Sequence, residues 1–142
     1  MRFMIIRRAD KETEAGAMPN GELLDAMMKY NEELIRAGVM LQGEGLQPSS
    51  KGVRVKFSGG KPNVIDGPFA ETKELIAGFA MLQVKSKEEA IEWVKRWPPI
   101  DAHGELEIEI RQVFEPEDFG PEGTEQIRKQ EEQLRTRRDE KK

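Results

Sequence analysis

The order of strand-like and helix-like segments along this chain predicts an α+β fold of the ferredoxin-like, split βαβ kind. The segments follow one another as strand, helix, strand, hairpin, strand, helix and strand. Each of the two helices has a single apolar face, so both can cover the same side of an antiparallel sheet. The chain has 142 residues and no cysteine, a length at which one domain buries a core without disulfides.

The first third of the chain supplies a strand, a helix and a second strand. Residues 2–8 are apolar on both faces, which favours a central strand, and residues 9–18 are expected to be a polar loop. A helix is predicted over 21–37 and ends at Gly38, which suits a left-handed C-terminal cap. A short strand follows over 39–46. The apolar positions at helical spacing are Leu23, Met27, Tyr30 and Leu34.

The middle of the chain predicts a hairpin and then a buried strand. Residues 53–57 alternate between apolar and basic side chains, and the turn over 58–61 leads into a return strand at 64–65. Residues 78–84 are the next predicted strand, again with apolar residues on both faces.

The second helix has the clearest boundaries. Ser86 is expected to cap its N-terminus and Glu89 to complete a capping box, while Pro98 and Pro99 end it. A last strand over 106–113 alternates strictly between aliphatic and charged residues. The buried stripe of the helix is predicted to be Ala90, Ile91, Val94 and Trp97.

The face of the sheet opposite the helices is predicted to be apolar. It would receive Phe3 or Met4 from the first strand and Phe79 or Ala80 from the central one. An apolar face of that size usually marks an interaction site. We therefore expect a homodimer that associates through its sheets.

The C-terminal segment differs in composition from the rest. Residues 1–115 are expected to form the folded domain, and residues 116–142 a charged extension that is helical or disordered. Thr124 is a possible cap for a helix running toward Asp139. Such a helix is marginal alone in water.

Composition narrows the possible partners. The net charge of -4 provides no concentrated basic face for nucleic acid. No apolar run is long enough for a signal peptide or a membrane span, so a cytoplasmic protein is expected. The segment 43–45 is too short for a phosphate loop, and Asp101 with His103 supplies too few ligands for zinc. No cofactor and no metal ion are expected.

The turn after the hairpin contains two candidate site residues. Asp66 favours a turn, Pro68 holds Gly67 in extended backbone, and Phe69 is an apolar anchor beside them. One interpretation is a strand-terminating turn with a solvated tip. The other is a loop that holds Asp66 and Glu71 at the mouth of a cleft, because sites concentrate on loops fixed by rigid strands.

Four further residues could take part in binding or chemistry. His103, the only histidine, could carry a proton near neutral pH, or could be a loop residue without a role. Glu44 lies between two glycines that leave its carboxylate room. Tyr30, the only tyrosine, needs a partner for its hydroxyl group. Arg111 could bind an anionic group or pair with Glu109 for structure.

From residue 2 to about 114 the chain resembles the DGPF group, which is related to the YCII proteins. The resemblance rests on four blocks, of which the second is the most specific. It implies a dimeric α+β barrel and a bacterial protein of a mostly uncharacterised group, some members of which accompany extracytoplasmic-function sigma factors. The blocks are residues 43–48, the nonapeptide 66–74, Gly78-Phe79 and Glu109-Ile110-Arg111.

The chain also departs from its relatives. YCII proteins are suspected of using a His-Asp pair, but the first helix here has no histidine and Pro98-Pro99 stands where an Asp-Pro would be expected. Gln112 replaces a proline that is typical after Glu-x-Arg. The dyad cannot be transferred to this chain.

Two hypotheses about function therefore remain. The first is a non-catalytic dimer that binds a small molecule or a regulatory protein. The second is an acid-base enzyme of isomerase, lyase or dehydrochlorinase type, acting on a small organic acid. In the second, Asp66 or His103 carries the proton, and Tyr30, Glu44, Phe69 and Arg111 line the cleft. Fold analogy alone cannot choose between them.

Overall fold

A computed structural model describes residues 1–141 of the chain. The chain divides into two compact units, Met1–Gln112 and Val113–Lys142. The predicted boundary after residue 115 lies within the second of these. Each unit is described by itself.

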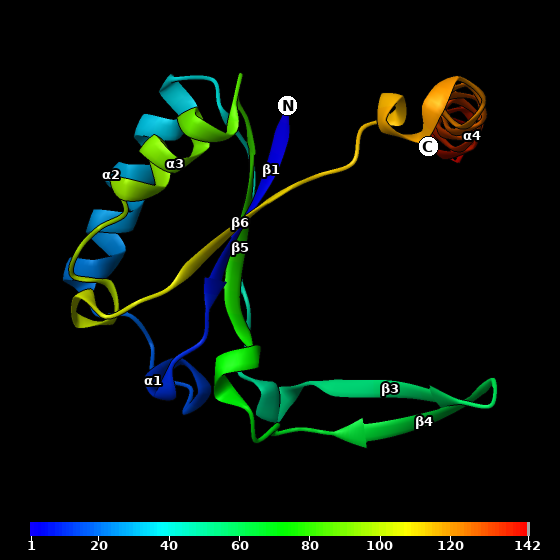
Figure 1. Ribbon diagram of the computed structural model, residues 1–142. Helices are drawn as coiled ribbons and strands as arrows, with labels where there is room; N and C mark the ends of the chain where they lie inside the picture. Colours follow the sequence, from blue (N-terminus) through cyan, green and yellow to red (C-terminus); the bar gives the residue numbers. More distant parts are fainter. Residues whose placement is uncertain (142) are drawn as a thin grey trace. The chain divides into compact units, whose positions relative to one another are not determined.

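The first unit is built on a four-stranded antiparallel sheet with the order β2-β5-β1-β6. Its strands are β1 (Arg2–Arg8), β2 (Met40–Gly45), β5 (Ile76–Gln83) and β6 (Ile108–Gln112). The helices α2 (Gly21–Arg36) and α3 (Lys87–Lys95) lie on one face of this sheet (Figure 1). The predicted α+β architecture with two helices on one face of an antiparallel sheet is confirmed.

The register of the sheet decides which side chains face the helices. Phe3 pairs with Leu82 and Ile5 pairs with Ala80, so these four side chains share the helix-covered face. The core forms there, under α2 and α3. Its buried members are Phe3, Ile5, Tyr30, Leu34, Val39, Leu82, Val84 and Ala90.

The opposite face, called the open face here, receives the alternate residues of the same strands. Met4 pairs with Met81 and Ile6 with Phe79, and all four side chains are half-buried in the single chain. On the edge strands, Glu44 pairs with Phe79 and Arg111 with Met4, so the open face also carries their charges.

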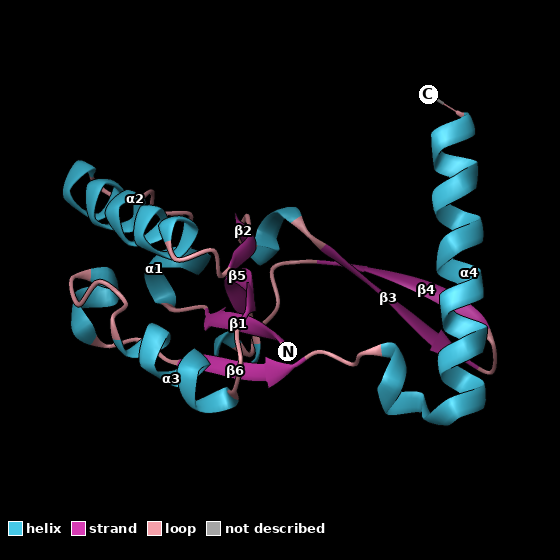
Figure 2. Cartoon of the chain, turned by 90° about the horizontal axis from the view of Figure 1, so that it is seen from above, coloured by secondary structure: helices cyan, strands magenta, loops and turns pink. Residues whose placement is uncertain are grey.

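A separate two-stranded ribbon interrupts the fold between β2 and β5. It consists of β3 (Val53–Ser58) and β4 (Lys61–Asp66), joined by Gly59 and Gly60, both in the left-handed region. In both views this hairpin projects on the side of the sheet away from α2 and α3 (Figures 1 and 2). The predicted hairpin is confirmed, but it forms its own sheet and does not join the main one.

Several local predictions need correction. Residues 9–18 are not all loop, because α1 (Lys11–Glu14) forms where Asp10 caps the backbone N–H of Thr13. Glu89 does not complete a capping box on Ser86, because its carboxylate accepts from the backbone N–H of Lys85. Ser86 itself caps the helix as predicted.

The second unit consists of a short 3-10 turn, Pro116–Phe119, and helix α4 (Gly120–Glu140). The rings of Phe114 and Phe119 lie 5.2 Å apart beside this turn. Thr124 does not cap the helix, since α4 begins four residues earlier and the Thr124 hydroxyl donates to the carbonyl of Pro116. None of the described residues of α4 is buried.

The remaining short elements are 3-10 turns at Ser49–Lys51, Thr72–Glu74 and Asp101–Gly104. No helix within residues 1–141 combines the length and apolarity that crossing a bilayer requires.

Candidate functional site

A cavity of about 770 Å³ lies beneath α2, between this helix, the α1 segment and the helix-covered face of the sheet. Pockets of this size hold small organic ligands in many proteins. Its walls are mostly apolar, and three of its lining residues are methionines, whose side chains adapt readily to different shapes. The apolar walls include Ile5, Leu23, Met27, Leu34, Met40 and Leu82, with Met18 nearer the solvent.

One corner of the cavity is an ion pair that is closed to solvent. Arg7 donates from Nε to Oδ2 of Asp101 at 2.9 Å and from Nη2 to Oδ1 at 2.7 Å. The indole Nε1–H of Trp97 donates to the same Oδ2 at 2.9 Å. Arg7 also reaches Asp10 at 3.3 Å and the carbonyl of Arg8 at 3.0 Å. The side chains of Arg7 and Asp101 are only 12% and 7% exposed.

The charges of this pair are mutually stabilised. Burial raises the pKa of Asp101, but the hydrogen bonds from Arg7 and Trp97 outweigh it, so the pKa lies below its ordinary value. The hydrogen bond to Asp101 in turn raises the pKa of Arg7. Asp101 is therefore a carboxylate, not a proton donor, at neutral pH.

Tyr30 forms the other polar wall. Its hydroxyl group donates to the backbone carbonyl of Trp93 at 2.6 Å, and its ring meets that of Trp97 edge-on at a centroid distance of 5.5 Å. Burial raises the pKa of Tyr30 to about 12. The phenol stays protonated at neutral pH, with its hydrogen bond already made.

The rim of the cavity is tied together by Glu14 and Ser49. The carboxylate of Glu14 accepts from the backbone N–H of Ser49 at 2.9 Å and also from its hydroxyl group. The Ser49 hydroxyl oxygen then accepts from the backbone N–H of Phe69 at 3.1 Å. These bonds join the α1 segment, which lines the cavity, to the turn that follows the hairpin.

That turn is packed against the same loop by Gly67. The backbone N–H of Gly67 donates to the carbonyl of Gly52 at 2.9 Å, and the peptide bond to Pro68 is cis. A Cβ at position 67 would lie 1.8 Å from the carbonyl oxygen of Ser49. The position therefore admits only glycine without a shift of the backbone. The guanidinium of Arg54 stacks on the ring of Phe69 at 3.9 Å, a cation–π contact.

The predicted site residues do not meet in a single chain. Tyr30 lines the cavity, and so does the position of Glu44, although its pairing with Phe79 directs the Glu44 side chain to the open face. Asp66, Phe69, His103 and Arg111 are not among the lining residues. Glu44 and Arg111 lie on opposite edge strands of the open face, about 16 Å apart when three strand spacings are combined with the two-residue offset between their rows. Their convergence with Asp66 across a subunit interface stays a prediction.

His103 lies at the margin of the cavity. Its Nε2 is 3.0 Å from Oε1 of Glu12, and both side chains are well exposed. Glu12 lines the cavity, as does Ala102 beside the histidine. The backbone of His103 is in the left-handed region, with φ of 56°.

Arg7, Trp97 and Asp101 were not predicted as a cluster. One signal was available, because Arg7 occupies the inward-facing position after Phe3 and Ile5 on β1. A buried arginine requires a carboxylate partner. The sequence did not identify which of the acidic residues that partner would be.

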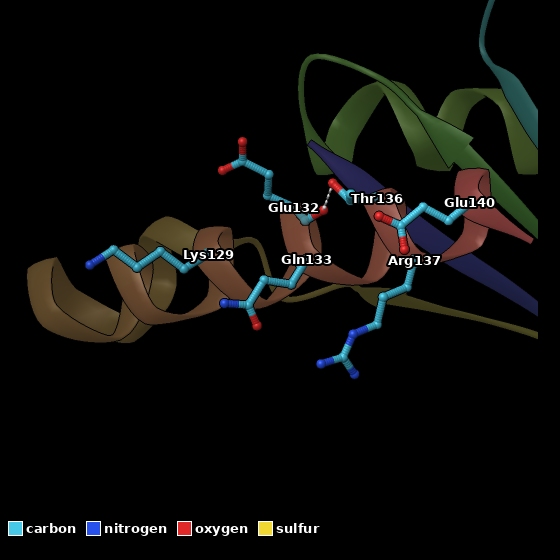
Figure 3. A pocket seen from close by; sticks show the side chains of 6 residues that line it. All are labelled: Lys129, Glu132, Gln133, Thr136, Arg137 and Glu140. Atoms are coloured by element: carbon cyan, nitrogen blue, oxygen red, sulfur yellow. Dashed lines mark hydrogen bonds between the residues drawn. The ribbon is translucent and has the colours of Figure 1, made fainter.

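A second, shallower depression of about 440 Å³ lies on α4 (Figure 3). Its lining residues all come from one polar face of that helix, opposite Ile127 and Leu134 in helical spacing. Thr136 donates within the helix to the carbonyl of Glu132 at 3.0 Å. This is a solvated helix face and not a binding site. The lining residues are Lys129, Glu132, Gln133, Thr136, Arg137 and Glu140.

Comparison with known proteins gives three findings. A family model described as the YCII-related domain matches residues 1–116. An uncharacterized protein of Rhizobium meliloti (strain 1021) is 34% identical over 61 residues, which are 43% of this chain and 49% of that protein. The chain thus matches about half the length of this relative.

Among solved structures, the chain is similar to 5-chloro-2-hydroxyhydroquinone dehydrochlorinase from Burkholderia phenoliruptrix AC1100 in complex with 2,5-dihydroxybenzoquinone. The sequences are 16% identical and the TM-score is 0.43, covering 81% of this chain and 96% of that one. A likeness this distant carries no argument about function.

Proposed function

The chain belongs to the YCII-related family, and from that premise we propose that it is a dimeric protein that binds a small organic molecule in the cavity beneath α2. The DGPF subgroup within this family remains a prediction from the resemblance.

The observation that supports binding over catalysis is the state of the polar groups in the cavity. Asp101 is held as a carboxylate by Arg7, and Tyr30 is held as a phenol by burial. A general acid or base works best with a pKa near the operating pH, and neither group is tuned in that direction. Asp101 and Tyr30 therefore shape the cavity and can orient a ligand in it, and the apolar walls supply the contact area.

The open face supports the dimer. Met4, Ile6, Phe79 and Met81 form an apolar patch across its two central strands. Helices cover the other face, so a second sheet is the natural cover for this one, at the usual sheet spacing of about 10 Å. The interface would be isologous, as in most homodimers.

Binding can be tested with a panel of small aromatic and aliphatic carboxylic acids, such as benzoate, 2-hydroxybenzoate and hexanoate, by calorimetry. Ala80→Leu adds bulk to the cavity wall, and Ala37→Leu, outside the lining, is the matched control. We expect Ala80→Leu to weaken binding about tenfold or more and Ala37→Leu to leave it unchanged. Equal affinity for both variants would place the ligand elsewhere.

A second candidate function rests on the Glu12–His103 pair at the cavity margin. An imidazole oriented by a carboxylate is a common general base, and this pair has the distance of a hydrogen bond, 3.0 Å. If a ligand from the panel is turned over, His103→Gln should abolish turnover and leave binding intact. Unchanged turnover in that variant would remove the pair from any mechanism.

A further inference from the structure

The hairpin β3–β4 has an apolar face that no other part of the first unit, Met1–Gln112, covers. Val55 pairs with Val64 and Phe57 with Pro62, which places them on one side of the ribbon together with Val53, whose partner Asp66 is the only charged residue on that side. The exposed fractions are 57% for Val53, 50% for Val55, 67% for Phe57 and 63% for Val64. An isolated two-stranded ribbon is at best marginally stable in water, so this face indicates a partner.

The base of the hairpin is held firmly. Gly67 lies in backbone contact with Ser49, and its N–H donates to the carbonyl of Gly52. Phe69 is stacked under Arg54, which belongs to β3 itself. The hairpin is thus an arm with a fixed exit direction, on the side of the open face (Figures 1 and 2).

The reach of the arm exceeds the distance between two packed sheets. Each of its strands has six residues, which is about 20 Å of extended chain, whereas stacked sheets lie about 10 Å apart. Any layer that covers the open face therefore lies alongside the arm. The tip of the arm, with Phe57, would pass beyond the plane of that layer.

The size of the open face indicates that the arm is needed for a stable interface. Four strands of five to eight residues present a face of roughly 400 Å² at standard strand dimensions. A stable interface buries about 800 Å² per partner. One face of the ribbon adds roughly 200 Å². In a symmetric pair each copy extends its own arm and also receives the arm of its partner. Each copy then buries its open face, one face of its arm and the surface that receives the other arm, and this total approaches the standard size.

We propose that the apolar face of the hairpin packs against a second copy of this chain, so that two copies exchange arms across their paired open faces. This inference rests on the proposed dimer. The occupant is a second copy because the open face and the arm are on the same side and together reach the required area. The opposite side of the ribbon carries Lys56 and Lys61, which remain exposed to water, and the pair of Arg54 with Ile65 near its base, where Arg54 stacks on Phe69.

The test compares substitutions on the two sides of one strand and on the sheet. Val55→Glu alters the apolar side of β3, Lys56→Glu is its neighbour on the polar side, and Met81→Glu alters the open face. Analytical ultracentrifugation measures the dimer dissociation constant, and circular dichroism with thermal melting checks folding. We expect Val55→Glu and Met81→Glu each to raise the dissociation constant about tenfold or more, and Lys56→Glu to leave it within about twofold.

The outcomes separate the arm from the dimer. A wild-type monomer at micromolar concentration overturns both. Loss of dimer with Met81→Glu but not with Val55→Glu overturns the exchange of arms and leaves the paired sheets. An equal loss with Val55→Glu and Lys56→Glu also overturns it, because the side of the ribbon would then be irrelevant.

A distance measurement provides an independent check. The chain has no cysteine, so Lys61→Cys allows a single spin label at the tip of the arm without disturbing its apolar side. Arms that cross should give one narrow distribution of distances between the two labels of a dimer. A broad distribution, as expected for mobile hairpins that do not pack against the partner copy, would overturn the proposal even if the dimer forms.

Discussion

Arg7 and Asp101 lie 94 residues apart in the sequence and meet in the fold through two hydrogen bonds, at 2.9 and 2.7 Å. The pair ties β1 to the turn after α3 and closes one corner of the cavity. Since both side chains are shielded from water, the loss of one partner would leave a charge without compensation.

Asp101→Asn should destabilise the protein by about 3 kcal/mol, the lower end of the cost of breaking a buried pair, because Arg7 keeps its contact with Asp10. Urea unfolding measures the difference. Asp25→Asn, on the exposed side of α2, is the control and should change the free energy of unfolding by less than about 0.5 kcal/mol. Similar values for both variants would make the Arg7–Asp101 pair energetically unimportant.

The stability difference between wild type and Asp101→Asn should depend on pH. The folded-state pKa of Asp101 lies below its ordinary value of 3.8. The stabilisation is therefore present above the ordinary value and is lost as pH falls through the folded-state pKa. Unfolding free energies measured from roughly pH 7 downward should converge for the two proteins in strongly acidic buffer. If the difference in unfolding free energy between the two proteins stayed constant with pH, the lowered pKa of Asp101 would be contradicted.

Tyr30 offers a spectroscopic check of the core beside the cavity. It is the only tyrosine, so tyrosinate absorbance reports on it alone. In the folded protein it should ionise with a pKa of about 12, above the ordinary 10.0. Because the folded-state pKa of Tyr30 is raised, the protonated phenol stabilises the folded protein at pH values below the ordinary pKa. This stabilisation is lost as the pH rises through the folded-state pKa. Ionisation near the ordinary value in protein that is still folded would show that Tyr30 is accessible to water.

Alternation and helical spacing were sufficient to locate the strands, the two helices and the hairpin. Gly38, predicted as a left-handed cap, has φ of +72°. Patterns of this kind are local, and local patterns do not specify pairing. The partner of Arg7 depends on where the turn after α3 lies relative to β1, and the cavity depends on the space left between α2 and the sheet. The α1 turn has four residues, too few to show a period, and only the capping interaction of Asp10 explains it.

Gly67→Ala should cost about 2 kcal/mol or more, because the added Cβ would overlap the backbone carbonyl of Ser49 and force the two segments apart. Thermal or urea unfolding measures the loss. Gly45→Ala is a matched control, since a Cβ at position 45 meets nothing within 4 Å. If the two alanines were equally tolerated, the close contact at position 67 would be wrong.

Deletion of residues 120–142 should leave the first unit folded. Met1–Gln112 forms a compact unit of its own, and none of the described residues of α4 is buried. We expect the melting temperature of the shortened chain to lie within about 2 °C of the full chain, because little apolar surface is lost. A larger drop, or loss of cooperative melting, would reveal a stabilising contact made by α4 in solution.

The contact between Gly67 and Ser49 changes what the motif around it can be expected to encode. Two backbones that touch leave no space for a side chain or a substrate at that point. In this chain the sequence Asp66-Gly67-Pro68-Phe69 forms a rigid turn that fixes the base and the direction of the hairpin. If the proposed exchange of arms holds, this motif contributes to how the chain assembles and not to what the cavity beneath α2 binds.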